Sequence, residues 1–322
     1  MVEKTPIQQQ IVQQQMTAQV LRLAPTQGMT QTALESVRLM RSNQPWPRHP
    51  VLYEPSICIV CQGRKRGFLG DQVFVYDPQQ YLVLSVPLPF EGETEASAEE
   101  PFLGVSLRID LTVAAELVLA LDEAGGPAVP APAGICATPL DAPLADAVLR
   151  LLQALASPLE ARLIGPSILR EIYFRVLTGE QGGAIRAALT HQSQFGKVAK
   201  ALRRIHAEID ADIDVGSLAR EAGMSVPAFH AHFKAVTQTS PIQYVKATRL
   251  HRARLLMVQE GASAAHAASR VGYESASQFS REFKRFFGRT PQEEAAAMRS
   301  ILVNSPALAT PMLGDRRYVA AT

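Results

Sequence analysis

A segment near the C-terminal end of the chain carries an arginine that could read a nucleic-acid base. Phe279 and Phe283 recur there at helical spacing, so Arg281 would point away from the core that the phenylalanines require. A guanidinium can donate two parallel hydrogen bonds to guanine, worth about 1–3 kcal/mol of discrimination between bases. A phosphate contact and an ion pair with Glu282 are the alternatives. The other residues expected on this free side are Ala276, Ser277, Gln278 and Arg285.

The same pattern occurs fifty residues earlier in the chain. MSVPAFHAHFKAVTQTSP (224–241) aligns with ESASQFSREFKRFFGRTP (274–291). In this alignment Phe229 matches Phe279. A period of this length indicates a duplicated supersecondary unit. The residues expected on the free side of the first copy are Val226, Pro227, His230, Ala231 and Lys234.

Each copy is expected to be two helices joined by a tight corner. Gly223 and Gly272 stand at the corners, where the chain must take the left-handed conformation that glycine adopts without strain. Such a pair of helices is a helix-turn-helix, whose second helix enters the major groove of DNA. A helix over 241–259 would join the copies and could set their reading helices roughly 34 Å apart, one turn of DNA. Side chains suited to cap the four helices are Asp214, Ser225, Ser263 and Ser275.

Charge is distributed unevenly along the 322 residues, although the formal net charge is only +2. Residues 191–300 hold 16 lysines and arginines against 10 acidic residues, whereas the rest of the chain holds 16 against 20. A basic block on an acidic remainder is typical of a protein in which one part meets nucleic acid. Ordinary surface variation is the alternative explanation.

Length and a hydrophobic content of 47% predict two domains of the α+β class. Residues 1–45 are expected to be a helical lead-in. Residues 46–180 would form a β-rich domain, a small cupin-like β-barrel or sandwich with a helical dimerisation element, because short apolar strands and turn signals run through 51–109. Residues 190–296 would form an all-α domain with the two helix-turn-helix units, and 297–322 a C-terminal tail.

Two apolar stripes at helical spacing follow the strands. One runs from Leu144 to Leu155, and the other from Ile168 to Val176. Both stripes could be buried in the core of their own domain. They could equally pair across a homodimer, so the stripes leave both arrangements open.

Cys58 and Cys61 form a C-x-x-C spacing within a predicted strand. Residues three apart in a strand point to opposite faces, so the two thiols are poorly placed to bond each other. Both could be small buried residues, or one could face the interior of the domain and react with an electrophile. The candidate effector-binding residues are Cys58, Cys61, Tyr76 and Tyr81, of which the tyrosines could also be core.

Several kinds of site are not expected. His49 is the only histidine in the first 190 residues, so we expect no metal site and no metallo-enzyme. We also expect no cofactor and no other enzymatic activity. Three cysteines give no disulfide framework, and the chain has neither a membrane-spanning apolar run nor a signal peptide, which predicts a cytoplasmic protein without a membrane partner. The run Arg64-Lys65-Arg66 could hold an anionic effector or be a solvated turn.

The C-terminal segments resemble the DNA-binding domain of the AraC/XylS family of regulators. The similar segments are GMSVPAFHAHFKAVTQTSPIQYV (223–245), RLHRARLLM (249–257) and AASRVGYESASQFSREFKRFFGRTPQE (267–293). The resemblance implies binding to double-stranded promoter DNA and activation through RNA polymerase. It implies base contacts by Pro227, His230, Ala231, Ala276, Ser277, Gln278 and Arg281. Phosphate contacts are expected from Ser225, Lys234, Arg249, Ser275, Lys284, Arg285 and Arg289.

The stretch 51–89 is similar to the effector domain of an AraC-type subfamily that includes regulators of aldehyde-reductase genes. This resemblance implies a small-molecule effector, with an aldehyde as one candidate. The alternative function is a small-molecule-binding or enzymatic cupin-like protein with a helical appendage. That protein would bind DNA weakly or without the salt dependence that phosphate contacts produce.

Overall fold

The computed structural model describes residues 6–125, 134–179, 182–189 and 194–303. Its N-terminal half contains two antiparallel sheets that pack face to face, with strand orders β1-β2-β9-β4-β7-β10 and β3-β8-β5-β6. Within the described residues the sheets stay open, so the β-rich domain is confirmed as a two-layer sandwich and not a closed barrel. The strands are β1 (Gly28–Gln31), β2 (Val37–Ser42), β3 (Trp46–Tyr53), β4 (Ser56–Gln62), β5 (Arg64–Leu69), β6 (Gln72–Tyr76), β7 (Gln80–Leu84), β8 (Leu88–Glu95), β9 (Phe102–Arg108) and β10 (Ile135–Pro139).

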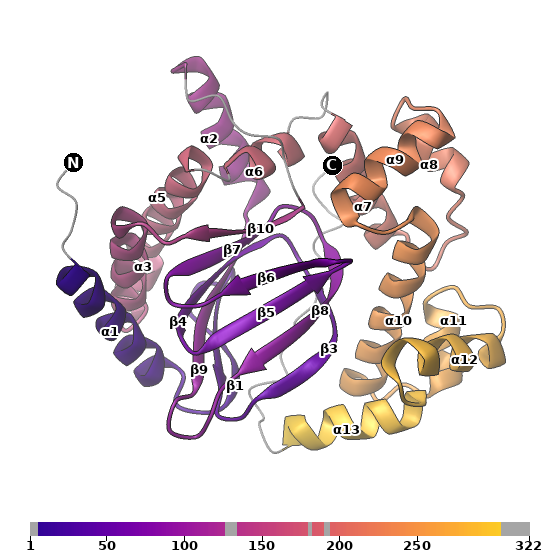
Figure 1. Ribbon diagram of the computed structural model, residues 1–322, viewed down its shortest axis with the longest axis horizontal. Coiled ribbons are helices and arrows are strands. Elements are labelled where there is room, and N and C mark those ends of the chain that lie inside the picture. Colours follow the sequence, from indigo (N-terminus) through magenta and orange to yellow (C-terminus); the bar gives the residue numbers. More distant parts are fainter. Residues whose placement is uncertain (1–5, 126–133, 180–181, 190–193, 304–322) are drawn as a thin grey trace.

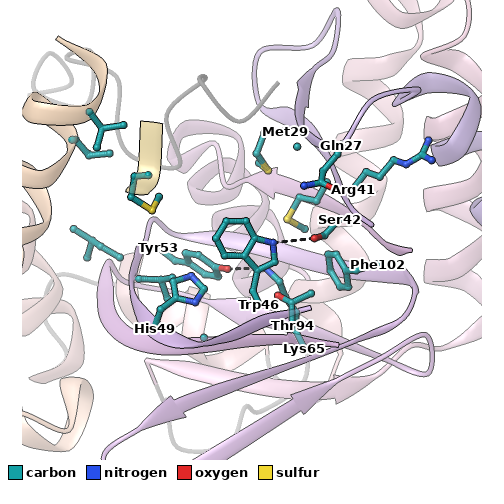
Figure 2. Close-up of a pocket in the computed structure, with 18 of the residues that line it drawn as sticks. Gln27, Met29, Arg41, Ser42, Trp46, His49, Tyr53, Lys65, Thr94 and Phe102 are labelled. Atoms are coloured by element: carbon teal, nitrogen blue, oxygen red, sulfur yellow. Dashed lines mark hydrogen bonds between the residues drawn. The ribbon is translucent and has the colours of Figure 1, made fainter. Parts of the chain in front are cut away.

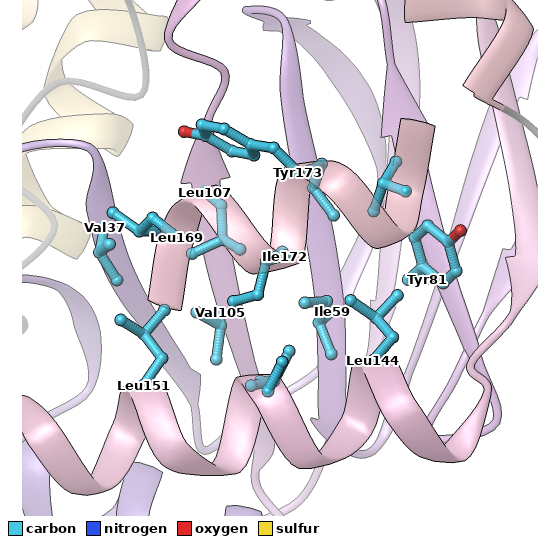
Figure 3. Packing of buried hydrophobic residues seen from close by; sticks show 14 of the residues in the cluster. Val37, Ile59, Tyr81, Val105, Leu107, Leu144, Leu151, Leu169, Ile172 and Tyr173 are labelled. Atoms are coloured by element: carbon cyan, nitrogen blue, oxygen red, sulfur yellow. The ribbon is translucent and has the colours of Figure 1, made fainter. Parts of the chain in front are cut away.

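The central strand β4 is buried on both of its faces, which explains its continuous apolar sequence. Cys58 and Val60 face the smaller sheet, whereas Ile57 and Ile59 face a layer of helices. Figure 3 shows side chains of α3 and α5 meeting the strands in this second layer. The helices of this half are α1 (Pro6–Leu23), α2 (Leu111–Glu123), α3 (Ala142–Ala154), α4 (Pro158–Leu163), α5 (Gly165–Thr178) and α6 (Gly182–Leu189).

The two apolar stripes are buried in the hydrophobic core of a single chain. Leu144 and Leu151 on α3, and Leu169 and Ile172 on α5, are buried against the larger sheet (Figure 3). A dimer therefore cannot use these faces, and any pairing between copies would need the outer sides of the helices.

The expectation of a helical lead-in over residues 1–45 is wrong beyond Leu23. Strands β1 and β2 follow the helix, and β2 pairs along its whole length with β9. The sequence VRLMRS buries Val37 and Leu39 against the helices, with Arg38 between them half-buried. This alternating segment is only six residues long. It forms a strand because it can pair with the free edge of β9.

The C-terminal half is helical, as predicted, and lies beside the sandwich (Figure 1). The long helix α10 runs between the two helix-turn-helix units, α8–α9 and α11–α12. The first unit shares one apolar core with the interior of the sandwich, whereas the second has a core of its own. The helices are α7 (Gln194–Ala207), α8 (Val215–Glu221), α9 (Val226–Thr237), α10 (Pro241–Gln259), α11 (Ala264–Arg270), α12 (Ala276–Phe287) and α13 (Pro291–Val303).

Candidate nucleic-acid interface and adjoining pocket

The second helix of each unit turns one side inward and leaves the other free. Phe229 and Phe233 on α9, and Phe279 and Phe283 on α12, are fully buried. Seven residues on the opposite sides were predicted to contact bases. All of them are exposed except His230, which is half-buried: Pro227, His230, Ala231, Ala276, Ser277, Gln278 and Arg281.

Local hydrogen bonds fix where these helices begin. The hydroxyl of Ser225 accepts from the Ala228 amide at 3.4 Å, and that of Ser275 from the Gln278 amide at 3.2 Å. Asp214 and Ser263 cap the first helices of the two units in the same way, so all four predicted caps are confirmed. At the second corner, Gly272 has a φ of +79°, and a Cβ there would lie 2.6 Å from the Asp210 carbonyl oxygen. Only glycine fits this corner.

Arg281 does not form the ion pair with Glu282 that the sequence left open. The Glu282 carboxylate instead accepts hydrogen bonds from Lys246 at 3.1 Å, Tyr273 at 2.8 Å and Gln278 at 3.2 Å. Burial acts to raise the pKa of Glu282, but these three donors outweigh it and hold the pKa below its usual value. Among the described residues Arg281 has no carboxylate partner, so its guanidinium is available to an external acceptor.

The exposed cations on α9, on α12 and just after α12 share this lack of ion pairs. None of Lys234, Lys284, Arg285 and Arg289 forms an ion pair within the described part of the chain. By contrast, Arg204 on α7 is paired with Glu208 and Glu221. Exposed cations that form no ion pair beside an exposed helix face are suited to phosphate contact.

Arg249 is the exception among the residues predicted to contact phosphate. Its guanidinium donates to the carbonyl oxygens of Ile209 at 3.0 Å, Ala211 at 2.7 Å and Gly272 at 3.2 Å. The donors of Arg249 are therefore used by contacts inside the domain. There Arg249 ties α10 to the loop before α8 and to the second glycine corner.

Two hydrogen bonds fasten α10 to the sandwich. The Tyr244 hydroxyl donates to the Pro87 carbonyl at 2.7 Å, and Nη2 of Arg254 donates to the Pro50 carbonyl at 3.3 Å. Arg254 is also paired with Glu294 of α13 at 3.3 Å, and its guanidinium lies 4.6 Å from the centre of the Phe287 ring. Pro50 lies in β3, and Pro87 directly precedes β8, the strand that pairs with β3, so the linker helix lies along this part of the smaller sheet.

A cavity of about 130 Å³ opens beside this contact, between the sandwich and helices α10 and α13. Its walls are mostly apolar and include Met29, Met40, Trp46 and Phe102. Figure 2 shows Tyr53, Lys65 and His49 around the same space, with Trp46 Nε1 donating to the Ser42 hydroxyl at 2.9 Å. The helical wall comes from Arg254, Leu255, Val258, Gln259 and Met298.

Two family models match the two halves of this chain. The model of the AraC-type transcriptional regulator N-terminus matches residues 33–184, and a helix-turn-helix domain model matches residues 218–296. The chain belongs to the AraC-type transcriptional regulators.

Curated relatives of this AraC-type chain are transcription regulators. The HTH-type transcriptional regulator ArgR of Pseudomonas aeruginosa is 28% identical over 149 residues, 46% of this chain and 45% of ArgR. The HTH-type transcriptional regulator AlkR of Acinetobacter baylyi is 32% identical over 96 residues, 30% of this chain and 31% of AlkR. The matched segments thus span less than half the length of either relative.

The solved structure of ToxT K231A from Vibrio cholerae has the same fold. It aligns with a TM-score of 0.56 over 84% of this chain and 98% of ToxT, at 10% sequence identity. At that identity the likeness shows the arrangement of a β-rich half and a helical half and carries no residue roles across.

The four effector-binding candidates of the AraC-type N-terminal half do not come together. Cys58 and Tyr76 lie between the sheets, whereas Cys61 and Tyr81 lie under the helices on the far face of the larger sheet. Burial raises the pKa of Cys58 and raises that of Cys61 to about 12, which keeps both thiols protonated. None of the four lines the cavity beside α10.

The residues that do line the cavity were largely missed from the sequence. Lys65 was singled out only as the middle of a charged run, although alternation along β5 turns it away from Arg64 and Arg66 and into the cavity. Within the described residues there is no group of three or more metal-binding side chains. The described helices also include none that is both long and apolar enough to cross a membrane.

Proposed function

We propose that this AraC-type chain is a sequence-specific DNA-binding transcription regulator and an activator. The observation that carries the proposal is the free side of α12, where Arg281 and the neighbouring cations are exposed without carboxylate partners among the described residues. A DNA duplex combines regularly spaced phosphates with base edges in a groove that admits a helix. The 19 residues of α10 make a rod about 28 Å long at 1.5 Å per residue, which suits two reading helices one DNA turn apart.

Roles at this interface follow from side-chain chemistry. We assign base contacts to Pro227, His230, Ala231, Ala276, Ser277, Gln278 and Arg281, with Arg281 as the main source of discrimination. We assign phosphate contacts to Ser225, Lys234, Ser275, Lys284, Arg285 and Arg289. Arg249 is given a structural role in place of a phosphate contact, because its donors already serve three carbonyls.

We infer that the chain works as a homodimer in the cytoplasm and that activation involves RNA polymerase. Support for the dimer comes from the outer side of the α4–α5 region, where four large apolar side chains are exposed: Leu159, Leu163, Ile164 and Phe174. This is the side that the monomer core leaves unused. Support for the polymerase and the compartment comes from the family and from promoter DNA as the partner.

We also propose that a small-molecule effector occupies the cavity beside α10. Structures of ToxT have been solved with an unsaturated fatty acid and with a naphthalenyl-butenoic acid bound, so a protein of this fold takes up small organic acids. In this chain the cavity touches Arg254, which holds α10 to β3. An effector there would act on the helix that sets the two units relative to each other.

The test is selection of bound sequences from random duplexes with the full chain, followed by a salt titration on the best sequence. We expect one enriched motif and an association constant that falls steeply with salt, since each neutralised phosphate contributes about 0.9 to the logarithmic slope. Failure to enrich any sequence, or an affinity indifferent to salt, would support the alternative of a cupin-like small-molecule protein.

A further inference from the structure

The cavity beside α10 contains a positive charge without a counter-ion. Lys65 is half-buried, and its Nζ donates to the Tyr53 hydroxyl at 3.0 Å and lies 5.1 Å from the centre of the Phe102 ring. Among the described residues no carboxylate pairs with it. The flanking Arg64 and Arg66 point to the other face of β5 and are paired with acidic side chains there.

The two arginines of the lining are held by several hydrogen bonds or by an ion pair. Arg41 donates to the carbonyl oxygens of Ala24 and Pro25, and Arg254 is paired with Glu294. Burial lowers the pKa of His49, so this ring is neutral at neutral pH. Lys65 is thus the cation in the lining that has neither a carboxylate nor a carbonyl partner among the described residues, and a partly desolvated ammonium is stabilised by an anion that enters beside it.

The apolar walls and the volume of the cavity determine which kind of ligand body fits in it. The walls facing Lys65 are formed by Met29, Met40, Trp46 and Phe102, which offer apolar contact and aromatic edges. A volume of about 130 Å³ is close to that of an apolar protein cavity of roughly 150 Å³ known to hold benzene. It accommodates one ring or a short branched chain.

We propose that the cavity binds a small monocarboxylic acid with a single-ring or short branched body, whose carboxylate pairs with Lys65. This inference rests on the proposed function, because it names the effector class of the same site. The ligand would contact Lys65 on β5 and Val258 on α10 at once, and so bridge the sandwich and the linker helix.

The test is calorimetric titration of the full chain with benzoate, 3-methylbutanoate, benzamide and oleate. Benzamide keeps the size of benzoate without its charge. We expect benzoate to bind at least tenfold more tightly than benzamide, since tenfold corresponds to ~1.4 kcal/mol and a charge-assisted hydrogen bond is worth about that or more. Equal affinities for benzoate and benzamide, tighter binding of oleate, or no binding of either small acid would overturn the proposal.

Two matched variants on β5 test whether Lys65 is the cation that binds the carboxylate. Lys65→Met keeps the length of the side chain and should reduce benzoate affinity at least tenfold while leaving benzamide unchanged. Arg64→Met, on the opposite face of β5, should bind benzoate like the wild-type chain. Lys65→Met removes a partly buried charge together with its hydrogen bond to Tyr53, so urea unfolding of the variant is measured to show that it is folded. If the variant is folded and still binds benzoate fully, the proposal is wrong.

The variants also separate this proposal from the proposed function. Lys65→Met should retain salt-dependent binding to the selected duplex, since Lys65 lies in the wall of the cavity and not on the exposed side of α9 or α12. Benzoate binding without any DNA binding would reject the regulator and leave the ligand class standing. DNA binding without binding of a small carboxylate would reject the ligand class and leave the regulator standing.

Discussion

The Tyr244 hydroxyl lies 2.7 Å from the carbonyl oxygen of Pro87, a residue 157 positions earlier in the chain. Nε2 of His206 lies 2.8 Å from the same hydroxyl, so the ring N–H can donate while the hydroxyl donates to Pro87. All of these atoms are at the seam where α10 meets the sandwich. Further along α10, Arg254 donates to the Pro50 carbonyl of β3, so the linker helix is bonded to the effector half as well as to the DNA-binding half.

Tyr244→Phe should destabilise the protein by about 1–3 kcal/mol, because the buried carbonyl of Pro87 and the ring of His206 would lose their partner. Urea unfolding followed by fluorescence measures the change. Tyr273→Phe is the matched control, since it also removes one hydroxyl but leaves Glu282 with its other two donors. A Tyr244 variant as stable as wild type would show that the seam is held by apolar contact alone.

The same seam predicts a dependence of stability on pH. Burial, with a smaller contribution from the charge of Arg252, lowers the pKa of His206 to about 4. The unfolded chain would protonate this residue near pH 6.5, so it binds more protons than the folded chain between those values. Stability should therefore fall as the pH drops from 6.5 towards 4, by roughly 3 kcal/mol for this residue.

Urea unfolding at pH 7 and at pH 4.5 tests that sign. His206→Asn keeps a donor but does not titrate, so it should lose less stability over this interval than the wild-type chain. His251, whose pKa burial also lowers, will leave some dependence in both proteins. An equal loss in the two proteins would show that His206 is protonated alike in the folded and unfolded states.

Features that depend on a few neighbouring residues could be predicted from the sequence. The caps at Asp214 and Ser225 join atoms within three residues, and the glycine corner follows from backbone sterics. The opposed directions of Cys58 and Cys61 follow from strand alternation, and the structure confirms them. The free sides of α9 and α12 follow from the spacing of their phenylalanines.

The cavity could not be predicted in this way, because its walls come from distant segments. Trp46, Lys65 and Arg254 meet only once the sandwich is paired and α10 is packed on it. Arg249 was misjudged for a related reason, since an arginine on a helix between two DNA-reading units looks like a phosphate contact until its three carbonyl partners are known. A sequence pattern predicts which face of a helix or strand a side chain occupies, whereas its hydrogen-bond partners depend on tertiary packing.

Arg249→Met and Lys284→Ala should therefore fail in different ways. Arg249→Met leaves three carbonyls without their donor and should lower the free energy of unfolding by about 1–3 kcal/mol. Lys284→Ala should leave stability within about 0.5 kcal/mol, because the side chain is exposed. In DNA titrations it should weaken all sequences alike and reduce the salt slope by about 1. A normal stability with a reduced slope for Arg249→Met would restore Arg249 as a phosphate contact.

The buried thiols should be inert in the native protein. Cys58 and Cys61 are 4% and 1% exposed, and burial raises the pKa of both. Because the thiolate is the reactive species, iodoacetamide at pH 7.5 should leave the mass of the folded chain unchanged. The urea-unfolded chain should gain three carboxamidomethyl groups from iodoacetamide as the positive control. Native modification of Cys58 within minutes would revive the idea of a thiol that senses electrophiles.

Arg281→Ala should relax sequence preference at one base pair of the selected site. The side chain is exposed on α12 and Glu282 does not hold it, so its guanidinium can reach a guanine edge when the helix enters the groove. Loss of a bidentate contact costs about 1–3 kcal/mol at that position and little on duplexes that already lack the guanine. Competition binding on a panel with each base at each position measures this. Lys284→Ala is the control that should shift the whole panel uniformly, and a uniform shift for Arg281→Ala as well would reassign Arg281 to phosphate.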